Sequence, residues 1–211
     1  VNPRVKVVGV QAQGVPSMRA SLDAGAAVTV EPGRTIADGI SVRRPGDLTL
    51  PLVKKYVDDI VTVDDEEIAN AILLLLEREK TVAEGAGAVA LAAAVHGKYP
   101  VKGKRTVMLV CGGNIDVNLV SRIIERGLVK DGRLVRLTVT VDDRPGALAK
   151  LTGEIATARA NVVEIHHNRA FIKSNLGDTQ VELVLETRGH DHVGELVERL
   201  QKAGYVVARD G

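Results

Sequence analysis

The hydrophobic pattern of the chain changes near residue 130, and this change constrains the fold more than any other feature. Before it, apolar residues form continuous runs at 5–10 and 59–63, which are typical of parallel strands covered on both faces. Helical segments separate these runs and predict an α/β domain. After it, residues 134–141 alternate between apolar and polar, and the following segments give the order βαββαβ of a ferredoxin-like domain. We therefore expect two domains, residues 1–129 and 130–211.

The sequence also predicts the local structure of four segments within these two domains. Residues 26–30 and 106–110 are apolar runs and predict two further strands of the parallel sheet. Residues 118–126 predict a helix that ends at Gly127, because glycine suits the position after a helix. Residues 171–178 predict the hairpin loop of the second domain.

The composition excludes several classes of function. The 211 residues carry a net charge of +1 and only 2% aromatic residues, which disfavours binding to nucleic acid or to an anionic membrane. No apolar run approaches the length that spans a membrane. Cys111 is the single cysteine, so a disulfide framework is impossible and a reducing, cytoplasmic location is expected.

A metal site is not expected. The acidic run 64–67 is better explained as a helix start, with Asp64 as N-cap and Glu67 completing a capping box. His166 and His167 are neighbours on an expected strand, so their side chains point to opposite faces and cannot chelate one ion together.

The chain enters a buried strand almost at once after Val1, and no initiator methionine precedes it. This pattern suggests a fragment whose first strand has partners upstream. The alternative explanation is a trimmed tag or a processed end.

One candidate ligand site follows the apolar run at 106–110. Ligands of parallel sheets bind beyond the carboxyl ends of strands, where Cys111 and the adjacent glycines stand. Glycines let a ligand approach the backbone, and the alternative is a glycine turn with an inert cysteine. Glu84 opens an apolar helix, either as an acid favoured by the helix dipole or as a buried carboxylate facing a cofactor. No neighbouring base supports a cysteine nucleophile.

Six motifs together resemble one enzyme family. Four of them occur in this order in threonine ammonia-lyases, and two resemble the ACT regulatory domain that is joined to some members. The first four are Gly9–Gly14, Thr35–Ile40, Glu84–Ala88 and Cys111–Asp116, and the last two are Asp143–Leu148 and Glu164–Arg169.

The resemblance implies a pyridoxal-phosphate (PLP) enzyme of the tryptophan-synthase β fold that converts L-threonine to 2-oxobutanoate and ammonia. It implies that Cys111 contacts the pyridine nitrogen, that Gly112 belongs to the cofactor site, and that Gly39 and Glu84 lie near the ring. The Schiff-base lysine motif and the phosphate loop of the family are absent, so no catalytic lysine is assigned and this chain alone is expected to be inactive. Gln13 stands where some relatives have a cation-binding acid, which argues against a metal.

For the tail, we expect a branched-chain amino acid, isoleucine or valine, to act as effector. A Pro-Gly turn that opens a helix leaves backbone N–H groups able to hold a carboxylate. The alternative is a plain helix start used only for subunit pairing. ACT domains usually pair edge to edge, so a homo-oligomer through both domains is expected. The effector residues would be Asp143, Gly146, Ala147, Leu148 and Asn161.

Two other functions stay open at this point. A stand-alone amino-acid-binding regulatory protein would explain the intact tail and the missing lysine. A serine dehydratase or serine racemase would use related chemistry, although the ACT-like tail disfavours it. Whether threonine is consumed for isoleucine synthesis or for catabolism is not encoded in these motifs.

Overall fold

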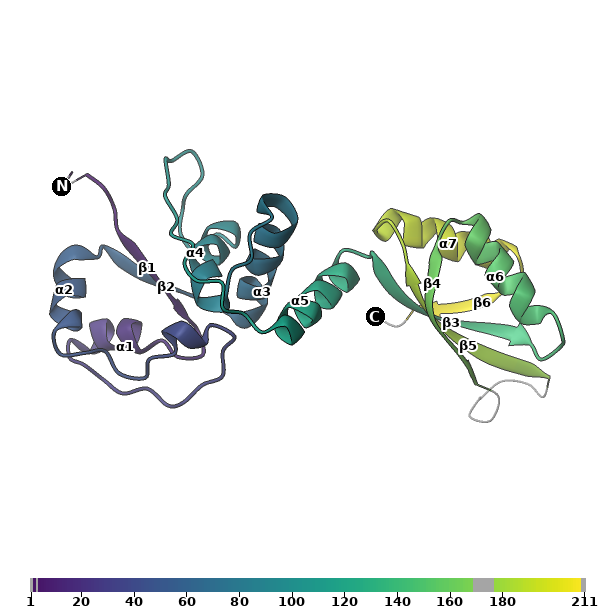
Figure 1. Ribbon diagram of the computed structural model, residues 1–211, viewed down its shortest axis with the longest axis horizontal. Coiled ribbons are helices and arrows are strands. Elements are labelled where there is room, and N and C mark those ends of the chain that lie inside the picture. Colours follow the sequence, from purple (N-terminus) through teal and green to yellow (C-terminus); the bar gives the residue numbers. More distant parts are fainter. Residues whose placement is uncertain (1, 3, 169–176, 210–211) are drawn as a thin grey trace. The chain divides into compact units, whose positions relative to one another are not determined.

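The computed structural model describes residues 2, 4–168 and 177–209, so most of the predicted hairpin loop at 171–178 lies outside the described residues (Figure 1). The chain divides into two compact units, residues 1–123 and 124–211. The division falls inside helix α5 (Val117–Lys130), and the domain boundary after residue 129 stays a prediction.

The first unit contains a parallel pair of strands, β1 (Val8–Ala12) and β2 (Asp59–Val63). Helices connect and flank this pair, which confirms the predicted α/β class with a parallel sheet. The remaining elements are α1 (Ser17–Ala24), the 3₁₀ turn η1 (Asp38–Ile40), α2 (Thr49–Tyr56), α3 (Asp65–Leu74), the π-helical turn η2 (Leu75–Glu79) and α4 (Gly85–Val95).

Helix α3 begins with the predicted capping box. The Asp64 carboxylate accepts from the Glu67 backbone N–H, and the Glu67 carboxylate accepts from the Asp64 N–H, both at 2.9 Å. Lys98 Nζ lies 2.8 Å from Glu67 Oε1, and this hydrogen bond raises the pKa of Lys98. The acidic run therefore fixes a helix start: Asp64 satisfies the N–H of Glu67, and the negative side chains suit the positive end of the helix dipole.

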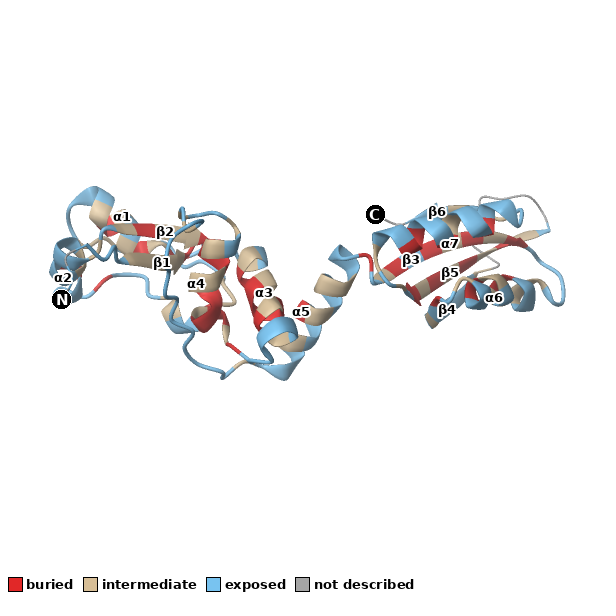
Figure 2. Cartoon of the chain, turned by 90° about the horizontal axis from the view of Figure 1, so that it is seen from above, coloured by how far each residue is buried: buried red, intermediate tan, exposed pale blue. Residues whose placement is uncertain are grey.

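One side of helix α4 is buried within the first unit, whereas Ala86, Ala90 and Ala94 are half-buried and Val95 is 48% exposed. Its small residues, such as Ala88 and Ala92, are fully buried, and α4 packs along α3 (Figure 2). Apolar residues on every side are typical of a helix that is enclosed in a protein interior. Glycine and alanine keep α4 thin, so neighbouring backbone can approach it closely.

Two predicted strands and one predicted helix end are wrong. Residues 26–30 and 106–110 form no strand and join neither sheet; Val30 makes a backbone hydrogen bond to Arg43, and Val107 is 90% exposed. An apolar run indicates a preference for strand, but a β-ladder forms only where a second strand supplies the backbone hydrogen-bond partners. Helix α5 also continues through Gly127, since a glycine inside a helix costs only about 1 kcal/mol, and it ends where Gly132 takes a left-handed φ of 67°.

The second unit has the predicted order βαββαβ. Its elements are β3 (Leu134–Asp142), α6 (Ala147–Thr157), β4 (Asn161–Asn168), β5 (Asp178–Glu186), α7 (His190–Lys202) and β6 (Val206–Arg209). The sheet order is β4-β5-β3-β6, and all neighbouring strands are antiparallel. This arrangement confirms the ferredoxin-like prediction.

Alternate residues of the two central strands form the core of the second unit. They are buried toward α6 and α7, whereas the residues between them are partly or fully exposed (Figure 2). Each fully buried aliphatic side chain stabilises the unit by about 1.5–3 kcal/mol. The core residues include Leu137, Val139, Val181, Leu183 and Leu185 from the sheet and Leu151, Ile155, Leu196 and Leu200 from the helices.

His192 connects separate parts of this unit by two hydrogen bonds. Its Nδ1 accepts from the backbone N–H of Arg188 at 3.1 Å, so that nitrogen carries no proton. Its Nε2 therefore carries the proton and donates to the carbonyl of Ala158 at 2.7 Å. The imidazole is 4% exposed and joins the end of α6 to the segment before α7.

Substitution of His192 by alanine is expected to destabilise the second unit. The Arg188 N–H and the Ala158 carbonyl would lose their partner, at a cost of about 1–3 kcal/mol for each group that stays buried. Hydrogen exchange of the β3 and β5 amides measures the loss. As a control, the exposed His166 can be replaced by alanine, with an expected change within about 0.5 kcal/mol. Equal effects of the two substitutions would contradict this role of His192.

Candidate functional site

Glu84 occupies the N-cap position of α4 and contacts the glycine motif that follows residue 110. Its backbone N–H donates to the carbonyl of Gly112 at 3.2 Å. Its carboxylate oxygen Oε2 accepts from the backbone N–H of Asn114, also at 3.2 Å. Residues 111–114 therefore lie across the N-terminal end of α4, although they form no strand there.

Two glycines permit this close approach. Gly112 has φ +78°, and a Cβ built on it would overlap the carboxylate of Glu84. Gly87 lies on the first turn of α4, and a Cβ there would overlap the carbonyl of Cys111. The Cys111 thiol is exposed. The structure thus places the Glu84 carboxylate against the backbone of residues 112–114, next in sequence to the exposed Cys111.

Gly39 approaches the same carboxylate from another part of the chain. It lies in η1, and a Cβ built on it would stand 3.1 Å from the Cβ of Ala86 and 3.6 Å from Oε1 of Glu84. The structure therefore brings all four predicted cofactor residues together: Gly39, Glu84, Cys111 and Gly112. Asn114 holds the Glu84 carboxylate and was not predicted, because its contact uses a backbone N–H that no residue type reveals.

The arrangement fits one side of a flat heteroaromatic cofactor. Glycines leave backbone approachable, an exposed thiol offers a weak donor or acceptor, and the Glu84 carboxylate is held by the Asn114 N–H. It does not supply a cradle for a phosphate or a lysine for a Schiff base. Among the described residues, no group of three His, Cys, Asp or Glu side chains could hold a metal ion.

Four of the five predicted effector residues line one small hollow in the second unit. It encloses about 260 Å³ at the end of β3, and His167 also borders it. Gly146 has φ +89° and begins α6 without a side-chain cap. The hollow is smaller than the roughly 300–1,000 Å³ of a drug-sized pocket and suits a ligand of amino-acid size. The predicted residues that line it are Asp143, Gly146, Ala147 and Leu148.

Asn161 lies at the opposite end of the sheet from this hollow. It pairs with Glu186, which pairs in turn with Leu134 at the start of β3, whereas Asp143 follows the end of β3. Asn161 and Asp143 are therefore separated by about the length of β3, roughly 25 Å along the strand direction. Asn161 donates to the Glu186 carboxylate at 3.0 Å and is exposed. Within one chain, Asn161 therefore cannot contact a ligand in the hollow.

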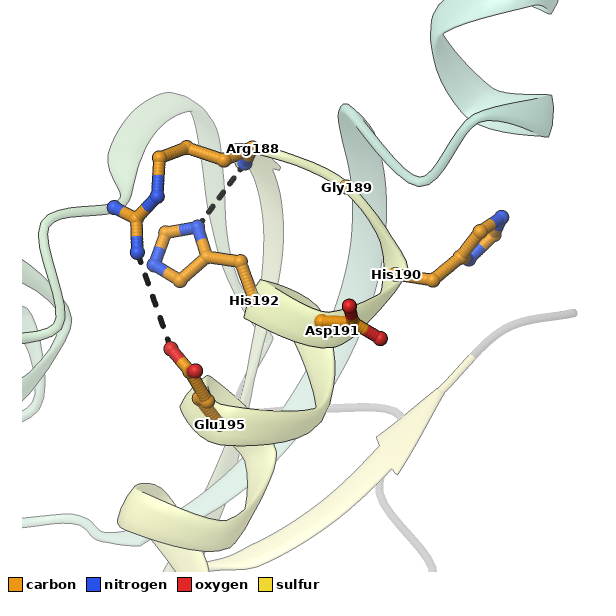
Figure 3. A pocket seen from close by; sticks show the side chains of 6 residues that line it. All are labelled: Arg188, Gly189, His190, Asp191, His192 and Glu195. Atoms are coloured by element: carbon orange, nitrogen blue, oxygen red, sulfur yellow. Dashed lines mark hydrogen bonds and ion pairs between the residues drawn. The ribbon is translucent and has the colours of Figure 1, made fainter.

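A second hollow, of about 430 Å³, lies at the start of α7 and contains none of the predicted residues (Figure 3). In Figure 3 the side chain of His190 points away from His192. Each imidazole already has a backbone partner, since His190 Nε2 lies 2.9 Å from the carbonyl of Lys130. The guanidinium nitrogen Nη2 of Arg188 lies 3.9 Å from the carboxylate oxygen Oε2 of Glu195. These side chains are engaged with the chain itself.

Comparison with known proteins identifies the class. Residues 1–112 match the model of the family described as pyridoxal-phosphate dependent enzymes, and residues 135–204 match the ACT domain. The chain belongs to the pyridoxal-phosphate dependent enzyme family, and an ACT domain follows the part that matches this family. These matches confirm the resemblance found in the sequence and the implied cofactor class.

The most specific similarity is to threonine ammonia-lyases. The chain is 53% identical over 207 residues to an L-threonine ammonia-lyase of Thermotoga maritima and 46% identical over 206 residues to one of Geobacter sulfurreducens. Each alignment covers 98% of this chain and 51% of the relative, so the chain spans about half the length of the curated relatives it matches. A threonine deaminase structure from Solanum lycopersicum is 31% identical with a TM-score of 0.55, over 59% of this chain and 35% of that one.

No helix in the described residues is long and apolar enough to cross a membrane.

A comparison of two glycines tests the contact between Gly112 and Glu84. Gly112→Ala and Gly103→Ala both place a side chain at a positive φ, +78° and +76°, which costs about 1–2 kcal/mol. Only Gly112→Ala also crowds another group, because nothing lies within 4 Å of a Cβ on Gly103. We expect Gly112→Ala to lose about 1–3 kcal/mol more in urea unfolding. Equal losses would show that Glu84 is not packed against Gly112.

Proposed function

We propose that this chain is the C-terminal part of an L-threonine ammonia-lyase, with a catalytic portion at residues 1–129 and an ACT regulatory domain at residues 130–211. The observation that carries the proposal is the similarity to enzymes of that name at 53% and 46% identity over 98% of this chain, because it spans both units rather than one. The reaction would convert L-threonine to 2-oxobutanoate and ammonia.

Four residues would hold one side of the cofactor ring. Cys111 would present its thiol, rather than a carboxylate, to the pyridine nitrogen and so would not force that nitrogen to be protonated. Gly39 and Gly112 would leave room for the ring, and Glu84, held by the Asn114 N–H, would keep a carboxylate beside it. Bound PLP supplies the electron sink for an elimination. The Schiff-base lysine and the phosphate-binding groups would come from sequence outside this chain.

Turnover by the full-length protein tests the proposed activity. We expect 2-oxobutanoate and ammonia in equal amounts from L-threonine, with a higher kcat/KM than for L-serine. The 211-residue chain alone is expected to produce neither. Racemisation of serine as the dominant reaction, or turnover by the 211-residue chain alone at rates typical of an enzyme, would reject the proposal.

The cofactor residues can be tested by thiol labelling of the full-length protein. Bound PLP should slow the labelling of Cys111 relative to the cofactor-free protein, because the thiol is exposed in this chain and would face the ring. Mass spectrometry of the labelled peptide identifies the site. An unchanged labelling rate at Cys111 would remove this residue from the cofactor site.

The ACT domain would bind isoleucine or valine as an allosteric effector. The carboxylate of the effector would bind at the start of α6, which has no side-chain cap and where backbone N–H groups and the helix dipole favour an anion. Asn161 lies too far along the sheet to join this hollow in its own chain. A shared site would therefore need Asn161 from a second protomer, which agrees with the expected homo-oligomer.

Mixed oligomers test this shared site. Full-length Asp143→Ala and Asn161→Ala should each give no binding heat with L-isoleucine or L-valine in calorimetry. If each site uses Asp143 of one protomer and Asn161 of another, mixed oligomers isolated with two affinity tags should regain part of the binding. Mixed oligomers that bind nothing, while wild type binds, would contradict sharing. No heat with wild type would reject both effectors.

We also propose a cytoplasmic location, since an exposed cysteine without a disulfide partner suits a reducing compartment.

A further inference from the structure

The segment that carries Gly39 is held in place by one carboxylate from α3. Oδ1 of Asp65 accepts from the hydroxyl of Thr35 at 2.7 Å and from the backbone N–H of Ile36 at 3.1 Å. The Thr35 hydroxyl oxygen accepts in turn from the backbone N–H of Ala37 at 3.1 Å. Asp65 thus organises three consecutive residues of a segment that lies 29 and 30 positions earlier in the sequence.

The opposite side of the same segment rests on the start of α4. The carbonyl of Ile36 lies where a Cβ on Gly85 would be, so the two backbones are in direct contact. Ala37 is fully buried, and Gly39 follows it against Ala86 and Glu84. The segment 35–40 is therefore clamped between Asp65 on one side and the N-terminus of α4 on the other.

Helix α3 does not need Asp65 for its own start. Asp64 and Glu67 already form the reciprocal capping box, and Glu67 is also paired with Lys98. A helix-dipole role alone would leave the Asp65 carboxylate facing solvent. Instead, Asp65 is only partly exposed and one of its oxygens accepts two hydrogen bonds from another segment.

We infer that Asp65 is a positioning residue for the cofactor site: through Thr35 and Ile36 it sets where Gly39 stands relative to Glu84. The inference rests on family membership and on the proposed cofactor residues. Asp65 itself would contact neither cofactor nor substrate. Without it, the segment 35–40 would lose its anchor on α3 and Gly39 would shift toward or away from the ring.

Two adjacent residues provide a matched comparison in the full-length protein. Asp65→Ala removes the anchor, and Asp64→Ala removes the N-cap of the same helix without touching residues 35–40. We expect Asp65→Ala to change the absorption spectrum of bound PLP and to lower kcat/KM for L-threonine by roughly 10- to 100-fold, since small misplacements in a site have effects of this size. Asp64→Ala should lower thermal stability comparably while the spectrum and kcat/KM stay near wild type.

Conservative variants separate positioning from a general loss of structure. Asp65→Asn keeps an acceptor oxygen at the same place and should restore most of the spectrum and activity. Thr35→Val removes the hydroxyl hydrogen bond to Asp65 and the acceptor of the Ala37 N–H but leaves the Ile36 N–H bonded to Asp65, so it should change the spectrum and kcat/KM in the same direction as Asp65→Ala. The double variant should change them by less than the sum of the two single effects, because both substitutions remove the Thr35–Asp65 hydrogen bond. Thr35→Ser should behave as wild type.

Hydrogen exchange gives a readout that needs no activity. In the cofactor-free protein, Asp65→Ala should speed exchange at the Ile36 and Ala37 amides, whereas Asp64→Ala should not. Equal effects of Asp64→Ala and Asp65→Ala on spectrum and exchange, or no rescue by Asp65→Asn, would overturn the inference. If wild type binds PLP but does not convert L-threonine, the proposed function fails, and the spectra and exchange rates still decide the role of Asp65.

Discussion

The close approach of three backbone segments at the start of α4 is the constraint on which the candidate site depends. Gly85 touches the carbonyl of Ile36, Gly87 touches the carbonyl of Cys111, and Gly112 makes room for the Glu84 carboxylate. A side chain at any of these glycines would push a segment away. Segments more than 70 positions apart in the sequence, 35–40 and 111–114, therefore meet at one helix terminus. The small residues of α4 are a requirement for assembling the site rather than a sign of weak packing.

In the second unit, by contrast, the candidate ligand site lies at one end of a regular sheet, where β3 ends and α6 begins. Its central strands bury alternate aliphatic residues, and α6 begins at a glycine with positive φ beside a small hollow. The sheet register separates Asn161 from that hollow by a strand length. If the proposed effector site uses both Asp143 and Asn161, it therefore needs two copies of this unit.

Much of this fold could be predicted from the sequence, because hydrophobic periodicity and capping residues are local signals. The βαββαβ order, the parallel pair and the Asp64–Glu67 capping box were all predictable in this way. The strand expected at 106–110 was not formed, because its apolar pattern says nothing about whether a partner strand is at hand. The sequence pattern marked Cys111, the adjacent glycines and Glu84 as candidates, whereas Gly39 was proposed only through the family resemblance. The roles of Asp65 and Asn114 were hidden, since they depend on which backbone N–H lies opposite and not on the residue's own neighbours.

We propose that Gly39, Glu84, Cys111 and Gly112 form the ring side of a PLP site, and that sequence outside this chain completes it. An experimental structure of the full-length protein with PLP tests it most directly. We expect the pyridine nitrogen to lie within hydrogen-bonding distance of Cys111 Sγ, with Glu84 and Gly39 beside the ring. A cofactor whose phosphate faces Cys111, or one bound away from the N-terminus of α4, would contradict it.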